Sequence, residues 1–275
     1  MRIVDAHQHY WALSTPGHQW PTPAEARIHR DFGPDDLSAA AGGMTLDRTI
    51  LVQSQPTDAD TDWMLALADR TPMTGAVVGW VDLASPGAPA RIAQLAAYPQ
   101  LRGLRPMLQS MADSDWLLDA SLEPAIAAMI AHGLRLDALV QPRHLPMLTR
   151  FTERWPDLPV VIDHAAKPFA ARGELDPWRE QIAALAEAGL WCKLSGLRTE
   201  QAQGQHADAL RPYVEHLVAC FGDRLMWGSD WPVLLLSGDS YADWVADAVR
   251  LSGLSDEPLE RLLAGAAEDF YHLEG

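Results

Sequence analysis

Residues 3–9 read Ile-Val-Asp-Ala-His-Gln-His, a short apolar and β-branched run that ends in two histidines. Similar runs recur along the chain and alternate with longer stretches of helical spacing, which is the pattern of a parallel sheet covered by helices. We predict about eight strands, at residues 3–7, 48–53, 76–81, 101–108, 134–140, 159–164, 190–195 and 225–230.

Helical patterns fill most of the intervals between these runs. We predict helices at residues 60–70, 89–97, 122–131, 145–155, 176–188 and 207–221, with closing helices at 244–251 and 259–270. The length of 275 residues is close to the roughly 250 of an α/β barrel. We therefore predict an α/β fold, a TIM-like (β/α)8 barrel that forms one domain over residues 1–275. A doubly wound open sheet is the competing fold, but it leaves edges that a barrel closes.

The composition restricts the partners. The net charge of −16 and the absence of a Lys/Arg run argue against nucleic acid. No apolar run approaches the roughly 20 residues that cross a bilayer, so no membrane partner is expected. Two cysteines and a polar N-terminus without room for a signal peptide favour a reducing, cytoplasmic location. We expect a neutral or mildly anionic small molecule as ligand; the sequence indicates no oligomeric state.

His7 and His9 form the first candidate motif, at the end of the first predicted strand. Because strand side chains alternate, both imidazoles project to the same face and can share one divalent metal or one ligand oxygen. Two incidental histidines are the alternative. Their position at the carboxyl end of a barrel strand favours a functional role.

Two further strand ends carry chemistry. The run Val-Val-Ile-Asp-His at 160–164 ends in an acid and a histidine that point to opposite sides of a strand, so we predict that only one, His164, faces the barrel axis. The run Leu-Met-Trp-Gly-Ser-Asp-Trp-Pro at 225–232 presents Asp230 at the carboxyl edge of the last strand. A carboxylate there can bind metal and accept a proton from water; capping the next turn is the alternative.

These three motifs and Cys-Lys-Leu-Ser-Gly-Leu at 192–197 resemble the sugar lactonase branch of the amidohydrolase superfamily (amidohydrolase-related family 2). The match is with lactonases of the L-fuconolactonase and L-rhamnonolactonase type. The resemblance implies a hydrolase that opens a sugar lactone, with His7, His9, His164 and Asp230 as catalytic residues. Asp230 would activate water, and the histidines would polarise the carbonyl.

The resemblance also implies that His7, His9, His164 and Asp230 are ligands of a divalent metal, zinc, which some members bind loosely and others dispense with. A zinc-dependent carboxy-lyase of the same superfamily and a non-catalytic sugar-binding barrel are the alternative functions. Relatives often have Arg-His near the fourth strand, where this chain has Arg105-Pro106, and this departure bears on which sugar is bound.

Further residues are candidates for substrate binding. Arg105 and Lys193 belong to predicted strands that would place them at the barrel mouth, although either side chain also suits an ion pair between layers. Trp20 and His18 lie in the long first loop, residues 10–34, where they suit a pocket wall or a loop anchor. Gln53 ends the second strand and suits hydroxyl recognition or a solvated loop.

Overall fold

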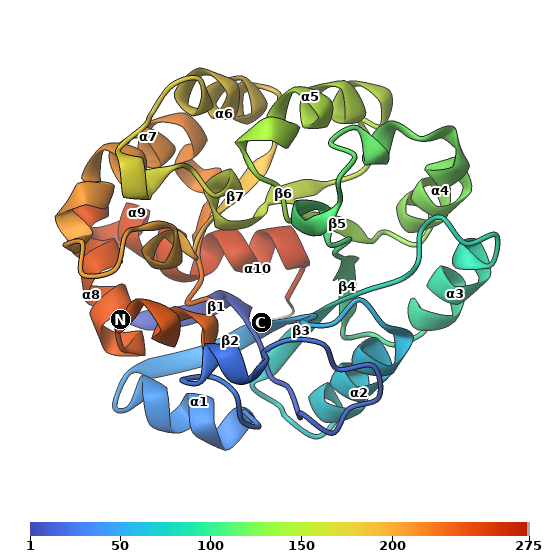
Figure 1. The fold of residues 1–275 in the computed structure, drawn as a ribbon, viewed down its shortest axis with the longest axis horizontal. Helices are drawn as coiled ribbons and strands as arrows, with labels where there is room; N and C mark the ends of the chain where they lie inside the picture. The colour runs from blue at the N-terminus through green and yellow to red at the C-terminus, as the bar shows by residue number, and fades with distance from the viewer. Residues whose placement is uncertain (274–275) are drawn as a thin grey trace.

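The computed structural model describes residues 1–273, and its eight parallel strands follow one another around a ring in the order of the sequence (Figure 1). The strands are β1 (Arg2–Gln8), β2 (Thr45–Val52), β3 (Thr74–Gly79), β4 (Leu101–Leu104), β5 (Arg135–Ala138), β6 (Val160–Ile162), β7 (Trp191–Leu194) and β8 (Leu225–Trp227). Each predicted strand is present. The later ones end earlier than predicted, and the polar residues that follow them belong to loops.

The helices surround the ring of strands, except the last one, which lies across it (Figure 1). They are α1 (Pro34–Ala41), α2 (Asp58–Ala68), α3 (Ala88–Leu95), α4 (Glu123–Ala131), α5 (Leu145–Arg154), α6 (Trp178–Glu187), α7 (Arg211–Phe221), α8 (Tyr241–Ser252), α9 (Asp256–Glu260) and α10 (Ala266–Tyr271). Helix α1 was not predicted. It is short and buries only Leu37 and Ala41, so it has little apolar periodicity. The predicted helix at 259–270 is interrupted by a π-helical turn at Arg261–Gly265.

The first and last strands meet through backbone hydrogen bonds just beyond β8. Asp230 N donates to His7 O at 2.8 Å, and His9 N donates to Trp231 O at 2.8 Å. A parallel bridge between Gln8 and Trp231 lies at the same place. The predicted barrel is therefore confirmed, and the open sheet is wrong. The same bonds fix the backbone of the two segments that carry His7, His9 and Asp230.

The inside of the barrel has an apolar lower layer. Val4, Ala6, Val161 and Met226 point inward and form one buried cluster, which also contains residues of β2, β3 and the C-terminal segment. Helix α10 crosses the ring in Figure 1 and contributes Tyr271 to this cluster. The last helix thus closes the amino-terminal end of the barrel, so the carboxyl ends of the strands form the open end. No helix within residues 1–273 is long and apolar enough to cross a membrane.

Candidate active site

His7 points into the barrel because β1 is irregular. Val4 and Ala6 already face inward, so strict alternation would place His7 on the outer side. The pairing of β1 with β2 shifts register between Asp5 and Gln8, and the imidazole turns toward the axis. Asp5 supports this turn, since its Oδ1 accepts hydrogen bonds from His7 N at 3.1 Å and from Ser229 N at 2.8 Å.

Asp163 and His164 both reach the barrel centre, contrary to the prediction that only one would. Val161 faces inward, so Asp163 follows by alternation. Strand β6 ends at Ile162, and His164 has a φ of 52°, as do its neighbours up to Lys167 within a few degrees. This left-handed backbone turns His164 inward as well. The alternation rule failed here because the strand had already ended.

Two glycines leave space for the histidines. A Cβ on Gly196 would lie 2.6 Å from His164 Nδ1, and one on Gly228 would lie 2.8 Å from His7 Cβ. Gly196 also has a φ of 63°, which suits glycine. The loops after β7 and β8 therefore approach the two imidazoles more closely than a residue with a side chain would allow.

The four predicted catalytic side chains meet at this point. Asp230 Oδ1 lies 3.4 Å from His9 Nε2 and 3.8 Å from the Nε2 atoms of both His7 and His164. His7 Nε2 and His9 Nε2 are 3.3 Å apart. All four residues are at most 4% exposed. The contacts on the other ring nitrogens, Val52 O to His9 Nδ1 at 2.8 Å and Ser195 Oγ to His164 Nδ1 at 2.8 Å, direct both Nε2 atoms toward Asp230.

The environment sets the charges of these groups. Burial lowers the pKa of His7 and of His164 well below the usual value, so both imidazoles are neutral at pH 7. Burial acts to raise the pKa of Asp230, but the electrostatic interaction with the neighbouring His164 ring and the hydrogen bond with His9 outweigh it, so this pKa lies below its usual value. Neutral imidazoles beside a carboxylate are suited to bind a cation.

A charged layer lies directly beneath His7. Lys193 Nζ is 3.2 Å from His7 Nδ1 and 3.0 Å from Asp163 Oδ1, and it also bonds Asp137. Lys193 is fully buried and does not line the pocket. The prediction that Lys193 binds substrate is therefore corrected: residue 193 faces inward below the histidines, where its ammonium contacts two carboxylates.

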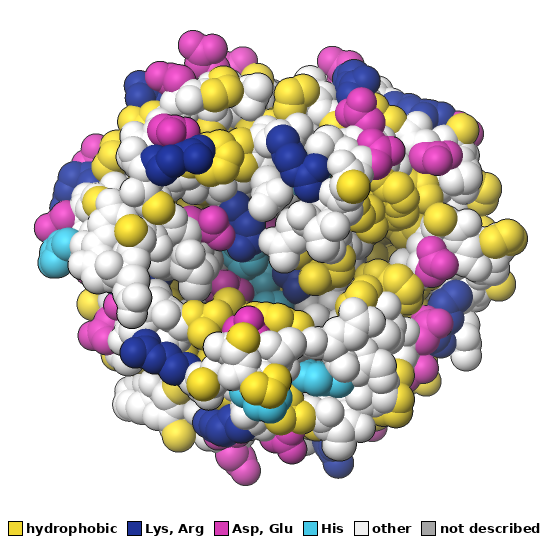
Figure 2. Space-filling model, viewed as in Figure 1, with side chains coloured by type: hydrophobic (Ala, Val, Ile, Leu, Met, Phe, Trp, Pro, Cys, Tyr) yellow, Lys and Arg dark blue, Asp and Glu magenta, His cyan; other side chains and the backbone are white. Residues whose placement is uncertain are grey.

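A pocket of about 340 Å³ opens above the cluster. Figure 2 shows a hollow at the centre of this face, with histidine, cationic and acidic side chains at its floor. The pocket is lined by His9, Trp20, Ser54, Arg105, Met107, Gln109, Leu139, His164, Lys167, Thr199, Glu200, Asp230 and Val233.

Of the remaining predicted binding residues, Arg105 and Trp20 line this pocket, whereas Gln53 and His18 do not. Gln53 is fully buried. Its side-chain Nε2 donates to the main-chain oxygen of Arg105 at 3.0 Å, and its main-chain oxygen accepts from Arg105 Nη2. Gln53 therefore holds Arg105 in place. His18 Nε2 lies 3.2 Å from Pro21 O within the first loop, as an anchor would.

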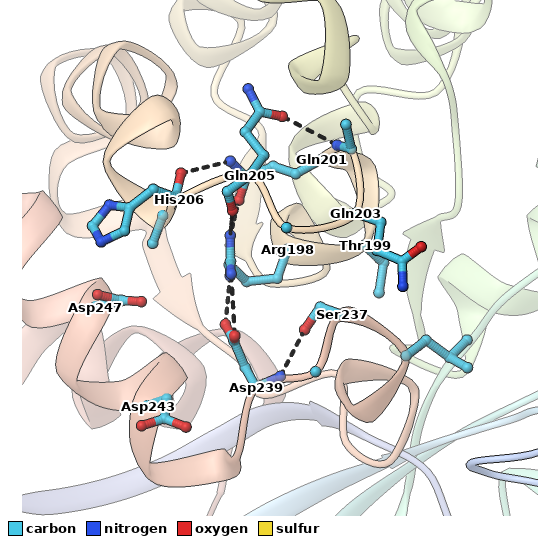
Figure 3. Close-up of a pocket in the computed structure, with 15 residues that line it drawn as sticks. Arg198, Thr199, Gln201, Gln203, Gln205, His206, Ser237, Asp239, Asp243 and Asp247 are labelled. Atoms are coloured by element: carbon cyan, nitrogen blue, oxygen red, sulfur yellow. Dashed lines mark hydrogen bonds and ion pairs between the residues drawn. The ribbon is translucent and has the colours of Figure 1, made fainter.

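A larger pocket of about 740 Å³ lies beside the first, between the loops after β7 and β8 (Figure 3). Arg198 at its centre pairs with both carboxylate oxygens of Asp239 and with Gln205 O. Its lining contains none of the four clustered side chains, and its polar groups bond largely to one another. The smaller pocket is therefore the candidate active site, and the Arg198–Asp239 pair joins two of the loops around it.

The donor set fits a divalent metal. Within residues 1–273, one group of possible ligands is His7, His9 and Asp230. In a tetrahedral zinc site with bonds of about 2.0–2.1 Å, ligand atoms stand roughly 3.3 Å apart, and the distances found are 3.3, 3.4 and 3.8 Å. His164 lies outside this group, in a second one with His7 and Asp163. Arg105 Nη1 lies 3.2 Å from His7 Nε2, so the Arg105 side chain would have to move away from this nitrogen for it to bind a metal.

Sequence reasoning missed the inward-facing acids Asp163 and Asp137. Both could have been found by counting alternate positions, because Asp163 follows inward Val161, and Asp137 lies between Leu136 and Ala138, which belong to the outer core. No sequence pattern around Tyr271 indicates that its hydroxyl reaches Asp137 inside the barrel.

This fold and centre define a class of protein: a (β/α)8 barrel with a histidine and carboxylate centre at the carboxyl ends of its strands. The family model described as Amidohydrolase matches residues 4–273, so the chain belongs to the amidohydrolase family, as predicted.

Close relatives cover nearly the whole chain. An L-fucono-1,5-lactonase of Burkholderia ambifaria is 48% identical over 279 residues, covering 98% of this chain and 96% of the relative. An L-fucono-1,5-lactonase of Burkholderia multivorans is 36% identical, with the same coverage. A crystal structure of a Burkholderia multivorans amidohydrolase with bound zinc is 33% identical, covers 100% of both chains and superimposes with a TM-score of 0.90.

Proposed function

We propose that this chain is a lactonase that opens the ring of a sugar-derived lactone by hydrolysis and releases the hydroxy acid. The observation that carries the proposal is the buried carboxylate of Asp230, 3.4 to 3.8 Å from three imidazoles at the floor of the pocket. The two relatives named L-fucono-1,5-lactonase support the reaction and agree with the sequence-based prediction.

Asp230 serves as the general base. Its lowered pKa keeps it ionised at neutral pH, so it can accept a proton from a water molecule that attacks the lactone carbonyl carbon. The bond between that carbon and the ring oxygen then breaks. The ring oxygen takes the proton from Asp230, which regenerates the carboxylate and yields the hydroxy acid.

We assign Arg105 and His164 to the lactone carbonyl oxygen, because both side chains line the pocket. Arg105 is 3% exposed. A guanidinium donor aimed at the oxygen that becomes negative stabilises the transition state, and it does so more strongly in a buried site than in water. This gives Arg105 a role in substrate binding and in catalysis.

His7, His9 and Asp230 would hold a divalent ion, with His164 beside them. Such an ion supplies Lewis acidity that polarises the lactone carbonyl. Zinc is the proposed ion, because the ligand atoms are two imidazole nitrogens and one carboxylate oxygen at suitable distances, and because the zinc-bound relative has the same fold.

The pocket suits a single sugar ring. Its volume of about 340 Å³ is near the lower end of the roughly 300–1,000 Å³ found for small-molecule sites. Met107, Leu139 and Val233 give it apolar surface, whereas Lys167 and Glu200, paired at 2.9 Å, present charged atoms for hydroxyl groups. The apolar surface suits the C–H face of a sugar ring, and the charged side chains suit the hydroxyl groups at its edge.

A panel of aldono-1,4-lactones and aldono-1,5-lactones of several configurations tests the proposal. Acid release is followed with a pH indicator, with and without a chelator, against the spontaneous rate. We expect turnover of at least one lactone and a loss of rate with chelator that zinc restores. Absence of acid release from every lactone, together with carbon dioxide release from an aromatic acid, would favour a carboxy-lyase instead.

A further inference from the structure

A line of buried polar contacts leads from His7 down to the C-terminal helix. Tyr271 OH donates to Asp137 Oδ2 at 2.7 Å, and the same oxygen lies 2.5 Å from Lys193 Nζ. Lys193 Nζ lies 3.0 Å from Asp163 Oδ1, which is 3.3 Å from His7 Nδ1. All five residues are fully buried. We call Tyr271, Asp137, Lys193 and Asp163 the positioning network.

The contacts of His7 select one tautomer. Arg105 Nη1 lies 3.2 Å from His7 Nε2 and Lys193 Nζ lies 3.2 Å from Nδ1, and because both cations can only donate, a neutral ring can accept from one of them. Asp163 Oδ1 lies 3.3 Å from Nδ1 and favours the proton there, which leaves Nε2 to accept from Arg105. Asp163 therefore keeps Nε2 unprotonated, and Nε2 is the atom that faces His9 and Asp230.

Asp163 depends on the rest of the network for its place. It sits between two cations, with Arg105 at 3.3 Å from Oδ2 and Lys193 at 3.0 Å from Oδ1. Lys193 in turn is held by Asp137, and Asp137 by Tyr271. The two carboxylates balance the two cations, which is the condition under which buried charges are tolerated. Loss of Asp137 would leave Lys193 free to draw Asp163 away from His7.

We propose that Asp137 and Tyr271 are positioning residues for His7, and that through Lys193 and Asp163 they fix the imidazole as its Nδ1–H tautomer. This inference deepens the proposed lactonase function and rests on it only for its kinetic readout. It assigns to the last helix, far from the pocket, an effect on the centre.

Two substitutions and one control test the proposal. Tyr271→Phe removes only the hydroxyl, and Asp137→Asn removes the charge with little change of shape. Tyr213→Phe is the matched control, because Tyr213 is 1% exposed and its OH donates to Glu174 O at 3.0 Å, away from the pocket. The tautomer of His7 is read by long-range ¹H–¹⁵N NMR on the metal-free protein, with His7→Gln for assignment. Zinc affinity is measured by competition with a chromophoric chelator, without any lactone.

We expect Asp137→Asn to weaken zinc binding and lower kcat by about 10–100-fold, as is typical for partners of ligating histidines. KM should change little, because neither residue touches the pocket. Tyr271→Phe should act in the same direction by a smaller factor. In both variants the His7 signals should move away from the pure Nδ1–H pattern, whereas Tyr213→Phe should change none of these quantities.

Unchanged tautomer and unchanged zinc affinity in Tyr271→Phe and Asp137→Asn would overturn the proposal, even if both variants melted at lower temperature. Tyr271→Phe decides alone if Asp137→Asn does not fold, since the phenylalanine preserves the packing. A wild-type protein that opens no lactone would refute the proposed function, yet the NMR and zinc measurements would still decide the role of the network.

Discussion

The contacts of His7 keep its fully buried imidazole neutral and determine which ring nitrogen is protonated. Lys193 and Arg105 each contact one ring nitrogen at 3.2 Å, so a proton on both nitrogens would face two cations in a medium that screens them poorly. Burial and Lys193 together lower its pKa. The ring therefore stays neutral, and the carboxylate of Asp163 determines which nitrogen carries the proton.

Asp230 is the residue whose loss should affect the chemistry most. Asp230→Asn keeps the shape but removes the base, so kcat should fall by about 10²–10⁴-fold. The melting temperature of the metal-free protein should change little, since the backbone N–H of residue 230 still bonds His7 O. Steady-state acid release and a thermal melt measure the two effects.

Asp243→Asn is the control for this substitution, because Asp243 lines the larger neighbouring pocket and caps α8. It should retain kcat. Equal losses in the two variants would place the chemistry elsewhere than at the proposed centre.

The buried histidines also make stability depend on pH. The pKa of His164 in the folded protein is well below its unfolded value near 6.5, so the unfolded chain binds more protons below that pH. The free energy of unfolding should then fall as the pH drops through 6.5, by up to about 1.4 kcal/mol per pH unit for this group. Asp5 has the opposite effect on the free energy of unfolding, because burial raises its pKa to about 6 and the folded protein then binds more protons than the unfolded chain.

Denaturant unfolding at pH 7, 6 and 5 measures this slope. His164→Asn should show a shallower decline of the unfolding free energy than the parent, whereas His132→Asn, at an exposed position, should show the parental slope. Parallel slopes in all three proteins would mean that His164 does not remain neutral when folded.

At the scale of elements, the decisive features lie where strands end. The short left-handed segment after β6 turns His164 inward, and the irregular end of β1 does the same for His7. The loops after β7 and β8 complete the site with a glycine beside each imidazole. The regular strands form the barrel, and the irregular backbone at their ends orients the side chains of the site toward one another.

This division explains what the sequence could predict. The strands and most helices follow from apolar periodicity, and the four clustered residues follow from their places at strand ends. The left-handed conformation of His164 could not be predicted, because non-glycine residues rarely adopt it and nothing in Asp-His-Ala-Ala marks it. Lys193 was misplaced because it lies inside β7, where its side chain points below the histidines, and its partners Asp137 and Asp163, on β5 and directly after β6, are distant from it in the sequence.

Gly196 offers a test of the close approach at the element scale. In Gly196→Ala the new Cβ would overlap His164, so the imidazole must move, and displacements near 1 Å can cost about 10²-fold in rate. Gly133→Ala is the matched control, with a φ of 65° against 63° and no atom of residues 1–273 within 4 Å of the new Cβ.

Both variants should lose about 1–2 kcal/mol of stability from left-handed strain, and Gly196→Ala should lose more because its Cβ also displaces His164; denaturant unfolding measures both losses. Only Gly196→Ala should lose most of its kcat. Equal activity of the two would show that the space beside His164 is not needed.

At the scale of the whole molecule, the proposed metal ligands lie on both sides of the seam between the first and last strands. His7 and His9 come from the end of β1, whereas Asp230 follows β8. Few backbone bonds join these two segments. An ion held by both would connect the beginning of the barrel to its end, so metal binding should stabilise the entire fold rather than one loop.

Zinc should therefore raise the melting temperature of the chelator-treated protein. At a free concentration about 1,000 times the dissociation constant, binding adds about 4 kcal/mol. For a chain of this length that corresponds to a shift on the order of 5–10 °C. An ion bound within a single loop would raise the melting temperature as much only if that loop unfolded together with the barrel.

The substitutions that abolish the zinc-induced rise therefore identify the ligands of the ion. His9→Ala and Asp230→Asn, on opposite sides of the seam, should each remove most of the rise, whereas Asp243→Asn should keep it. A shift that persists in both seam variants would locate the zinc elsewhere, because neither strand end could then be holding it.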